Sequence, residues 1–173
     1  MIRNQIVKEA LSFVGQEEIR GNIGFKEDKF QQYMETMGWD KGQAWCAYFA
    51  ELVWKMAYSK FDSTFISRLD KLFNAGAVAT WNNFSKSDFK TSDIPEPGDV
   101  VIWQSLKNGK PHWTGHAGVV IEVNGNTFKS VEGNTNDKGG REGYIVAVKD
   151  RPLNFEPKEM GLVLKGFIKP IEV

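Results

Sequence analysis

The sequence contains almost no cysteine and very little histidine. Among its 173 residues there are one cysteine, Cys46, and two histidines, His112 and His116. A single cysteine excludes an intramolecular disulfide framework. The two histidines spell HxxxH, but no helix is predicted there and no third ligand accompanies them, so we expect no zinc.

An excess of charge and a long apolar run are both absent. Lys and Arg together number 22, as do Asp and Glu. Binding to nucleic acid needs a basic face that displaces counterions, so we expect no nucleic-acid partner. No apolar run approaches the roughly 18 residues of a membrane span. The N-terminal MIRNQIVKEALSFVGQEE lacks the apolar core and cleavage site of a signal peptide, so we expect cytoplasmic synthesis.

The overall composition of the chain is typical of one globular domain. Hydrophobic residues make up 41% and charged residues 25%, and no repeat or polar linker divides the chain, so residues 1–173 are predicted to form a single domain. In the first half, apolar residues recur every three or four positions, and Gly15 and Gly38 stand where two of these patterns stop. We expect helices at 2–14, 28–37, 63–73 and 78–84, and another that begins near Trp45.

The second half changes to a strand pattern. PEPGDVVIW is a turn that leads into a strand, and NGN at 124–126 is a hairpin signal. We expect strands at 100–103, 116–123, 127–133, 144–149 and 161–169, with a polar loop at 135–143. Helices followed by an antiparallel meander predict an α+β fold, in which N-terminal helices pack on an antiparallel sheet.

The lone cysteine lies in AWCAYF, at the expected start of a helix. A free cysteine is most often a buried apolar side chain, which is one interpretation of Cys46. The other is a nucleophile, because the unpaired N–H groups and dipole of a helix N-terminus lower the pKa of a thiol. In that case the backbone N–H of Cys46 could face the oxyanion of a reacting carbonyl.

A thiolate nucleophile that works near neutral pH needs a histidine base. His116 follows Gly115 in GHAGVV, and we expect it to begin a strand with its ring exposed over the end of the sheet. The flanking glycines would leave room there for substrate. His112 lies in NGKPHWTG, which reads as a turn-rich loop, and we expect its side chain to face solvent.

The group that orients the base should lie on the neighbouring strand. Pairing of the 116–123 and 126–133 segments brings Glu132 and Asn134 beside His116, and alternation predicts that both point to the same face. Either could accept the imidazole N–H and fix the tautomer. The alternative is that EGNTND is simply a polar turn.

Four motifs, in this order, carry a resemblance to a known family: AWCAYFAELVW, PEPGDVVIW, GHAGVVIEV and SVEGN. Together they resemble the CHAP domain (cysteine, histidine-dependent amidohydrolase/peptidase). The similarity spans roughly residues 15–135. It implies a papain-like fold and cleavage of amide bonds in bacterial peptidoglycan, by amidase or endopeptidase activity.

Position by position, the resemblance places the family's nucleophile on Cys46, its base on His116 and its third polar member on Glu132, with Asn134 as an auxiliary or alternative orienter. Gln43, three residues before the cysteine, could donate a second hydrogen bond to the oxyanion. Some members of the family bind calcium through an acidic loop before the cysteine. Here that loop is GWDKGQ with one acidic residue, so we predict neither a metal nor another cofactor.

The aromatic residues offer two candidates for substrate binding. Trp45 precedes the nucleophile and is expected to shield it on one side, whereas Trp113 lies in a polar segment and is the tryptophan expected to be most exposed.

Two other functions stay open: a non-catalytic wall-binding module of the same fold, and a cysteine acyltransferase. An enzyme that acts on the wall without a leader would be released like a phage endolysin or injected as an effector, and an effector would need an immunity protein as partner.

Overall fold

The structure is a computed structural model that describes residues 1–136 and 143–173. The helices are α1 (Ile2–Ser12), α2 (Asp28–Thr36), α3 (Cys46–Tyr58), α4 (Thr64–Leu72) and α5 (Ala77–Phe84). The strands are β1 (Glu18–Ile19), β2 (Gly24–Phe25), β3 (Thr91–Ser92), β4 (Val100–Lys107), β5 (Lys110–Asn124), β6 (Thr127–Thr135), β7 (Ile145–Pro152) and β8 (Met160–Ile168).

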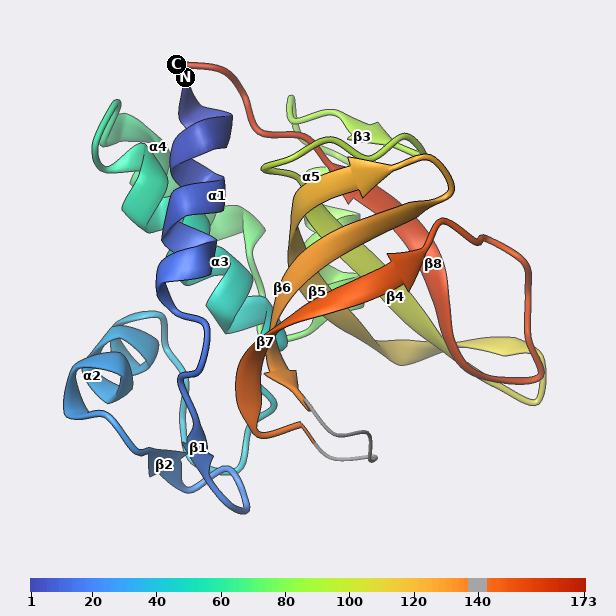
Figure 1. Ribbon diagram of the computed structural model, residues 1–173, viewed down its shortest axis with the longest axis horizontal. Helices are drawn as coiled ribbons and strands as arrows, with labels where there is room; N and C mark the ends of the chain where they lie inside the picture. The colour runs from blue at the N-terminus through green and yellow to red at the C-terminus, as the bar shows by residue number, and fades with distance from the viewer. Residues whose placement is uncertain (137–142) are drawn as a thin grey trace.

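Six of the strands form one antiparallel sheet, in the order β3-β8-β4-β5-β6-β7, and β1 and β2 form a separate small hairpin. Figure 1 shows α1 to α4 gathered on one side of this curved sheet, with the two chain ends close together. The predicted α+β class, with N-terminal helices packed on an antiparallel sheet, is confirmed.

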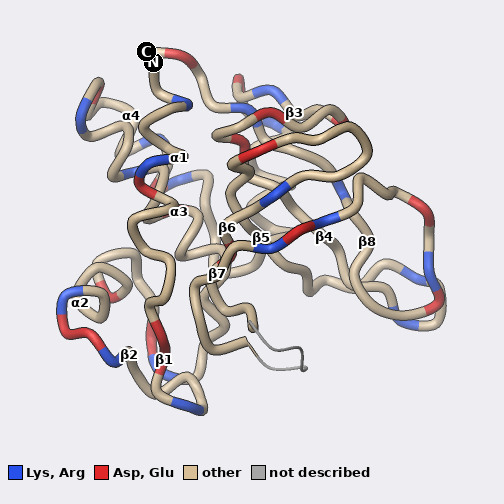
Figure 2. Tube along the Cα trace, in the orientation of Figure 1, with Lys and Arg blue, Asp and Glu red and all other residues tan. Residues whose placement is uncertain are grey.

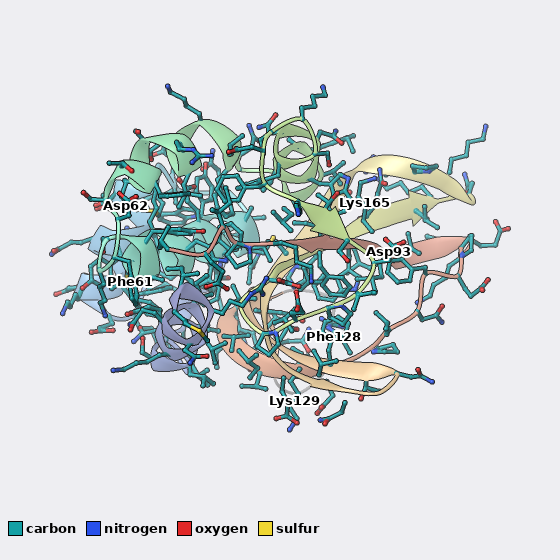
Figure 3. The ribbon with its side chains drawn as sticks, turned by 90° about the horizontal axis from the view of Figure 1, so that it is seen from above. Phe61, Asp62, Asp93, Phe128, Lys129 and Lys165 are labelled. Atoms are coloured by element: carbon teal, nitrogen blue, oxygen red, sulfur yellow. The ribbon has the colours of Figure 1, made fainter. Side chains whose placement is uncertain are left out.

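The alternating side chains of the sheet fill two apolar clusters. Val100, Ile102 and Val119 belong to the larger cluster, which lies between the sheet and the helices. Their neighbours Val101 and Trp103 belong to a second cluster on the other side, together with Val120, Phe128, Leu164 and Phe167. Figure 3 shows Phe128 inside the curve of the sheet, and Lys129, the next residue, on the outside.

Helix α3 is the central helix. Every residue of α3 except Met56 is buried, because the helix packs against α1 on one side and against β5 and β6 on the other. Its sequence is correspondingly apolar nearly all the way round, as expected for a helix enclosed by other elements. This packing holds the N-terminus of α3 against the middle of the sheet, which is where Cys46 lies.

Basic and acidic residues are interspersed along the trace, as Figure 2 shows. Asp99 is one of the buried acidic residues, and its carboxylate accepts hydrogen bonds from Arg3 at 2.8 Å and Lys169 at 2.6 Å. These contacts join α1, the turn before β4 and the chain after β8.

No helix in the described part of the chain is both long and apolar enough to cross a membrane.

Two predictions from the sequence need correction. Strand β5 begins at Lys110, so His112 lies in a strand instead of a loop, and His116 lies in its middle instead of at its start. The start was missed because the Pro and Gly residues in 109–115 read as turn signals. Strands β1, β2 and β3 were not foreseen, because strands of two residues carry no periodicity. The predicted polar loop at 135–143 lies largely outside the described residues.

Candidate active site

Cys46 is the first residue of α3 and lies in a cleft. Its side chain is in the hydrophobic core but keeps 6% exposure, and it lines a cleft of about 760 Å³. Other parts of the lining come from Gln43 and Ala44, from the small-residue segment 74–79 with Asn82, and from Trp113 to Gly115 on β5. The sulfur is therefore not sealed off by hydrocarbon.

His116, on β5, lies beside the Cys46 thiol, close enough for its charge and hydrogen bonding to act on the pKa of that thiol. Burial by itself would raise the pKa of Cys46, but the charge of His116, its hydrogen bond and the backbone N–H groups of Ala117 and Ala47 lower that pKa overall. Burial would likewise lower the pKa of His116, but the charge and hydrogen bonds of Cys46 and Glu132 raise it to about 10. The arrangement favours a thiolate–imidazolium pair at neutral pH.

Glu132, on β6, lies on the other side of the imidazole. The distance from His116 Nε2 to Glu132 Oε2 is 2.8 Å, and the carboxylate has no exposed surface. This contact assigns Nε2 to the carboxylate and leaves the other ring nitrogen for the thiol. The hairpin pairing of β5 and β6 therefore brings Glu132 to His116, as the sequence indicated.

Two further side chains hold Glu132, and sequence reasoning missed both. Arg151, on β7, donates from Nε to Oε1 at 2.8 Å and from a terminal nitrogen to Oε2 at 2.6 Å. Ser130 donates its hydroxyl to Oε1 at 2.6 Å. Burial would raise the pKa of Glu132, but the hydrogen bonds from Arg151 and His116 and their charges lower it to about 2. Glu132 is thus a fixed, ionised carboxylate.

The glycines that flank His116 allow close packing. A Cβ on Gly115 would lie 2.1 Å from the backbone oxygen of Trp103, and one on Gly118 would lie 2.7 Å from Cγ of Glu132. We expected the glycines to leave room for substrate. At Gly118, however, Glu132 fills this space. Gly115 does line the cleft.

A comparison with protein-family models gives a match to the CHAP domain over residues 38–134. The chain belongs to the CHAP-domain family. No curated protein and no solved structure matches the chain. CHAP domains are in general cysteine- and histidine-dependent amidohydrolases or peptidases, and membership implies peptidoglycan as the substrate. The matched segment contains Cys46, His116, Glu132 and Asn134, whereas Arg151 lies beyond its end.

Gln43 of this CHAP domain lies in the cleft with its amide fixed. The backbone N–H of Asp40 and the hydroxyl of Tyr48 both donate to Gln43 Oε1, each at 3.0 Å. Because a backbone N–H can only donate, these contacts identify the oxygen end of the amide. The nitrogen end is left to serve as a donor.

Among the described residues, no three His, Cys, Asp or Glu side chains form a group that could hold a metal ion.

The two predicted substrate-binding tryptophans differ in their surroundings. Trp113 is 77% exposed, as expected, and lines the CHAP cleft, with its ring centroid 5.5 Å from that of His112. Trp45 has no exposed surface, so the prediction that it contacts substrate is wrong. Its indole N–H donates to Glu18 at 2.7 Å, and its ring packs edge-on against Phe25. It supports the start of α3 from within the core.

Asn134 lies at an irregularity of β6. Between Glu132 and Thr135 the register with β7 shifts by one residue, and Asn134 has a φ of 52°. The extra residue interrupts the alternation from which we placed Asn134 on the same face as Glu132. His116 Nε2 donates its hydrogen bond to Glu132. A role for Asn134 as auxiliary orienter stays a prediction.

Replacing Gly118 by alanine is expected to lower kcat/KM by about 10- to 100-fold, because the new methyl group displaces a carboxylate that three side chains hold in place. The free energy of unfolding should fall by roughly 1–3 kcal/mol from overpacking. Gly125→Ala is the control. It lies in the β5–β6 turn at a φ of 58° with open space around it, so it should cost stability without changing kcat/KM. Equal kcat/KM for Gly118→Ala and wild type would contradict this account.

Proposed function

We propose that this CHAP domain is a cysteine-dependent hydrolase that cleaves amide bonds of bacterial peptidoglycan through a thioester. The observation that supports the proposal most directly is the continuous contact Cys46–His116–Glu132, with the sulfur in an open cleft. A thiolate needs a base, an orienting group and access to substrate, and these two contacts and the cleft supply them.

In the first half of the proposed reaction, the Cys46 thiolate attacks the carbonyl carbon of the scissile amide. The oxyanion is held by the backbone N–H of Cys46, which lies in the first turn of α3, where no helical carbonyl accepts it, and by the amide nitrogen of Gln43. The His116 imidazolium then gives its proton to the departing amine, and the C–N bond breaks to leave a thioester on Cys46.

In the second half, neutral His116 takes a proton from water, and the water oxygen attacks the thioester. The thiolate leaves, the carboxylic acid product departs and the imidazolium is restored. Glu132 keeps the imidazole in one tautomer and orientation through both halves, and it stays ionised throughout.

The cleft suits an uncharged acyl group. The segment 74–79 reads NAGAVA, and with Gln43, Ala44, Asn82 and Thr114 it lines the cleft without a Lys, Arg, Asp or Glu. Trp113, exposed at this surface, is proposed to contact the glycan or peptide by stacking. Muramoyl–alanine amides and peptide cross-links both meet this description, so amidase and endopeptidase activity are the two forms of the proposal.

The decisive experiment is mass spectrometry of purified peptidoglycan after digestion. Intact stem peptides freed from glycan identify an amidase, and new amino termini within peptides identify an endopeptidase. Enzyme alkylated at Cys46 is the control, and it should release neither product. If the active and alkylated enzymes give the same products, the proposal fails.

Alkylation of Cys46 by iodoacetamide is expected to be faster at pH 7 than that of a small model thiol. The pKa of the thiol is lowered, so the thiolate is present above that lowered value, and the imidazolium beside it persists until the pH approaches about 10. The rate should therefore rise with a midpoint below the ordinary thiol range. Because Cys46 is the sole cysteine, the measurement reports one site.

His116→Gln is the matched control for this titration. It removes the imidazolium but leaves the burial that raises the pKa of the thiol, so the midpoint should move above the ordinary value.

An alkylation rate of the wild-type protein no faster than that of the model thiol would favour a non-catalytic wall-binding module. Products that form only when an amine is added would favour an acyltransferase. Phage-type release, injection and an immunity partner stay predictions from the sequence.

A further inference from the structure

The carboxylate of Glu132 lies between two cationic groups. His116 Nε2 is 2.8 Å from Oε2, and the Arg151 guanidinium spans both oxygens at 2.6 and 2.8 Å. Two parallel N–H···O bonds fix both the position and the plane of a carboxylate, which a single donor does not do. The charges therefore alternate from Cys46 through His116 and Glu132 to Arg151.

Arg151 is itself held in place by Trp103. The guanidinium carbon lies 5.1 Å from the centre of the Trp103 ring, within the range of a cation–π contact. The same ring lies 5.7 Å from the His116 ring and stacks on Phe128. One indole therefore supports the base on one strand and the arginine on another.

We propose that Arg151 is a positioning residue of this active site, which clamps the Glu132 carboxylate so that it holds the His116 imidazole toward Cys46. The inference rests on the proposed function. It adds to the Cys–His–Glu set a residue on β7, outside the segment that matches the CHAP-domain model.

The charge of Arg151 has a second consequence, which can be measured. The titratable groups facing His116 are Cys46 on α3 and Glu132 on β6, with Arg151 on β7 behind Glu132. Removing a nearby positive charge raises the pKa of every titrating neighbour. Without Arg151, the pKa values of Cys46 and His116 should both move upward, whereas a residue that only stabilises the fold would leave both in place.

The test compares Arg151→Met, which removes the charge, with Arg151→Lys, which keeps it but loses the bidentate geometry. In Arg151→Met we expect kcat/KM on peptidoglycan to fall by about 10- to 100-fold, and both limbs of its pH profile to move upward by about one unit. In Arg151→Lys we expect a fall of several-fold, with both limbs unmoved.

Arg68 provides a matched control. One of its terminal nitrogens donates to both oxygens of Asp88, at 2.6 and 2.7 Å, and its guanidinium lies 4.6 Å from the centre of the Phe65 ring, so it makes an ion pair and a cation–π contact outside the cleft lining. Arg68→Met should retain wild-type kcat/KM and pH limbs. Circular dichroism of each variant verifies that it is folded.

The pH dependence of Cys46 alkylation gives a readout that needs no substrate. In Arg151→Met its midpoint should rise by about one unit. An unchanged midpoint would overturn the proposal, even if activity fell, because the loss would then be one of structure alone. A wild-type kcat/KM in both Arg151→Met and Arg151→Lys would also overturn the proposal. If wild type itself released no product while the midpoint still shifted, the proposed function would fail and the role of Arg151 in holding the Cys–His–Glu set would stand.

Discussion

Cys46→Ala is expected to reduce the release of peptides or new amino termini from peptidoglycan by at least about 10⁴-fold. Nucleophile, base and orienting carboxylate act as a unit, so loss of the sulfur removes the covalent path entirely. The fold should survive, because one small side-chain atom leaves a site that already borders a cleft. Product release by mass spectrometry and thermal unfolding of the same samples would measure both effects.

Cys46→Ser sharpens this test. A serine hydroxyl keeps the size and hydrogen-bonding capacity of the thiol but stays protonated beside His116 near neutral pH. It should be nearly as inactive as Cys46→Ala. Activity within tenfold of wild type in either variant would rule out the thioester mechanism.

Glu132→Gln is expected to combine a large loss of activity with a large loss of stability. The amide can no longer stabilise the imidazolium, so kcat should fall by about 10²- to 10⁴-fold. It also leaves Arg151 partly buried without its counter-charge, which costs about 3–5 kcal/mol when one partner of a buried pair is removed. Urea unfolding and single-turnover kinetics would measure the two effects separately.

The stability loss in Glu132→Gln should depend on pH. The pKa of Glu132 in the folded protein is lowered to about 2, so its contribution is present above the carboxyl's ordinary pKa and is lost as the pH falls toward 2. Asp88→Asn is the control, because it breaks an ion pair with Arg68 at the surface and should leave unfolding almost unchanged. A Glu132→Gln variant as stable as Asp88→Asn at neutral pH would contradict the account of Glu132 as a buried, paired carboxylate.

The features that local patterns encode were predictable. Helical spacing of apolar residues placed α2, α4 and α5 close to their observed bounds, and the NGN turn fixed the β5–β6 hairpin that brings Glu132 to His116. Cys46 at the start of α3 followed from the position of one thiol before an apolar helix. Each of these depends on residues near one another in the sequence.

The features missed depend on contacts between distant segments. Arg151 reaches Glu132 only because β7 pairs with β6, and nothing near residue 151 identifies it as part of a site. Trp45 was predicted to bind substrate because it adjoins Cys46, but it is buried against Glu18 and Phe25, which lie far from it in the sequence. The position of Asn134 depended on a one-residue bulge that alternation cannot foresee.

The sulfur and its base come from different layers of the molecule, Cys46 from the helices and His116 from the sheet. Before these layers dock, the chain carries an ordinary thiol with no imidazole beside it. Chemical reactivity at residue 46 is therefore a property of the completed fold, and the unfolded chain should be inert toward amide bonds. The rate of alkylation during refolding would report directly on the moment at which helix and sheet come together.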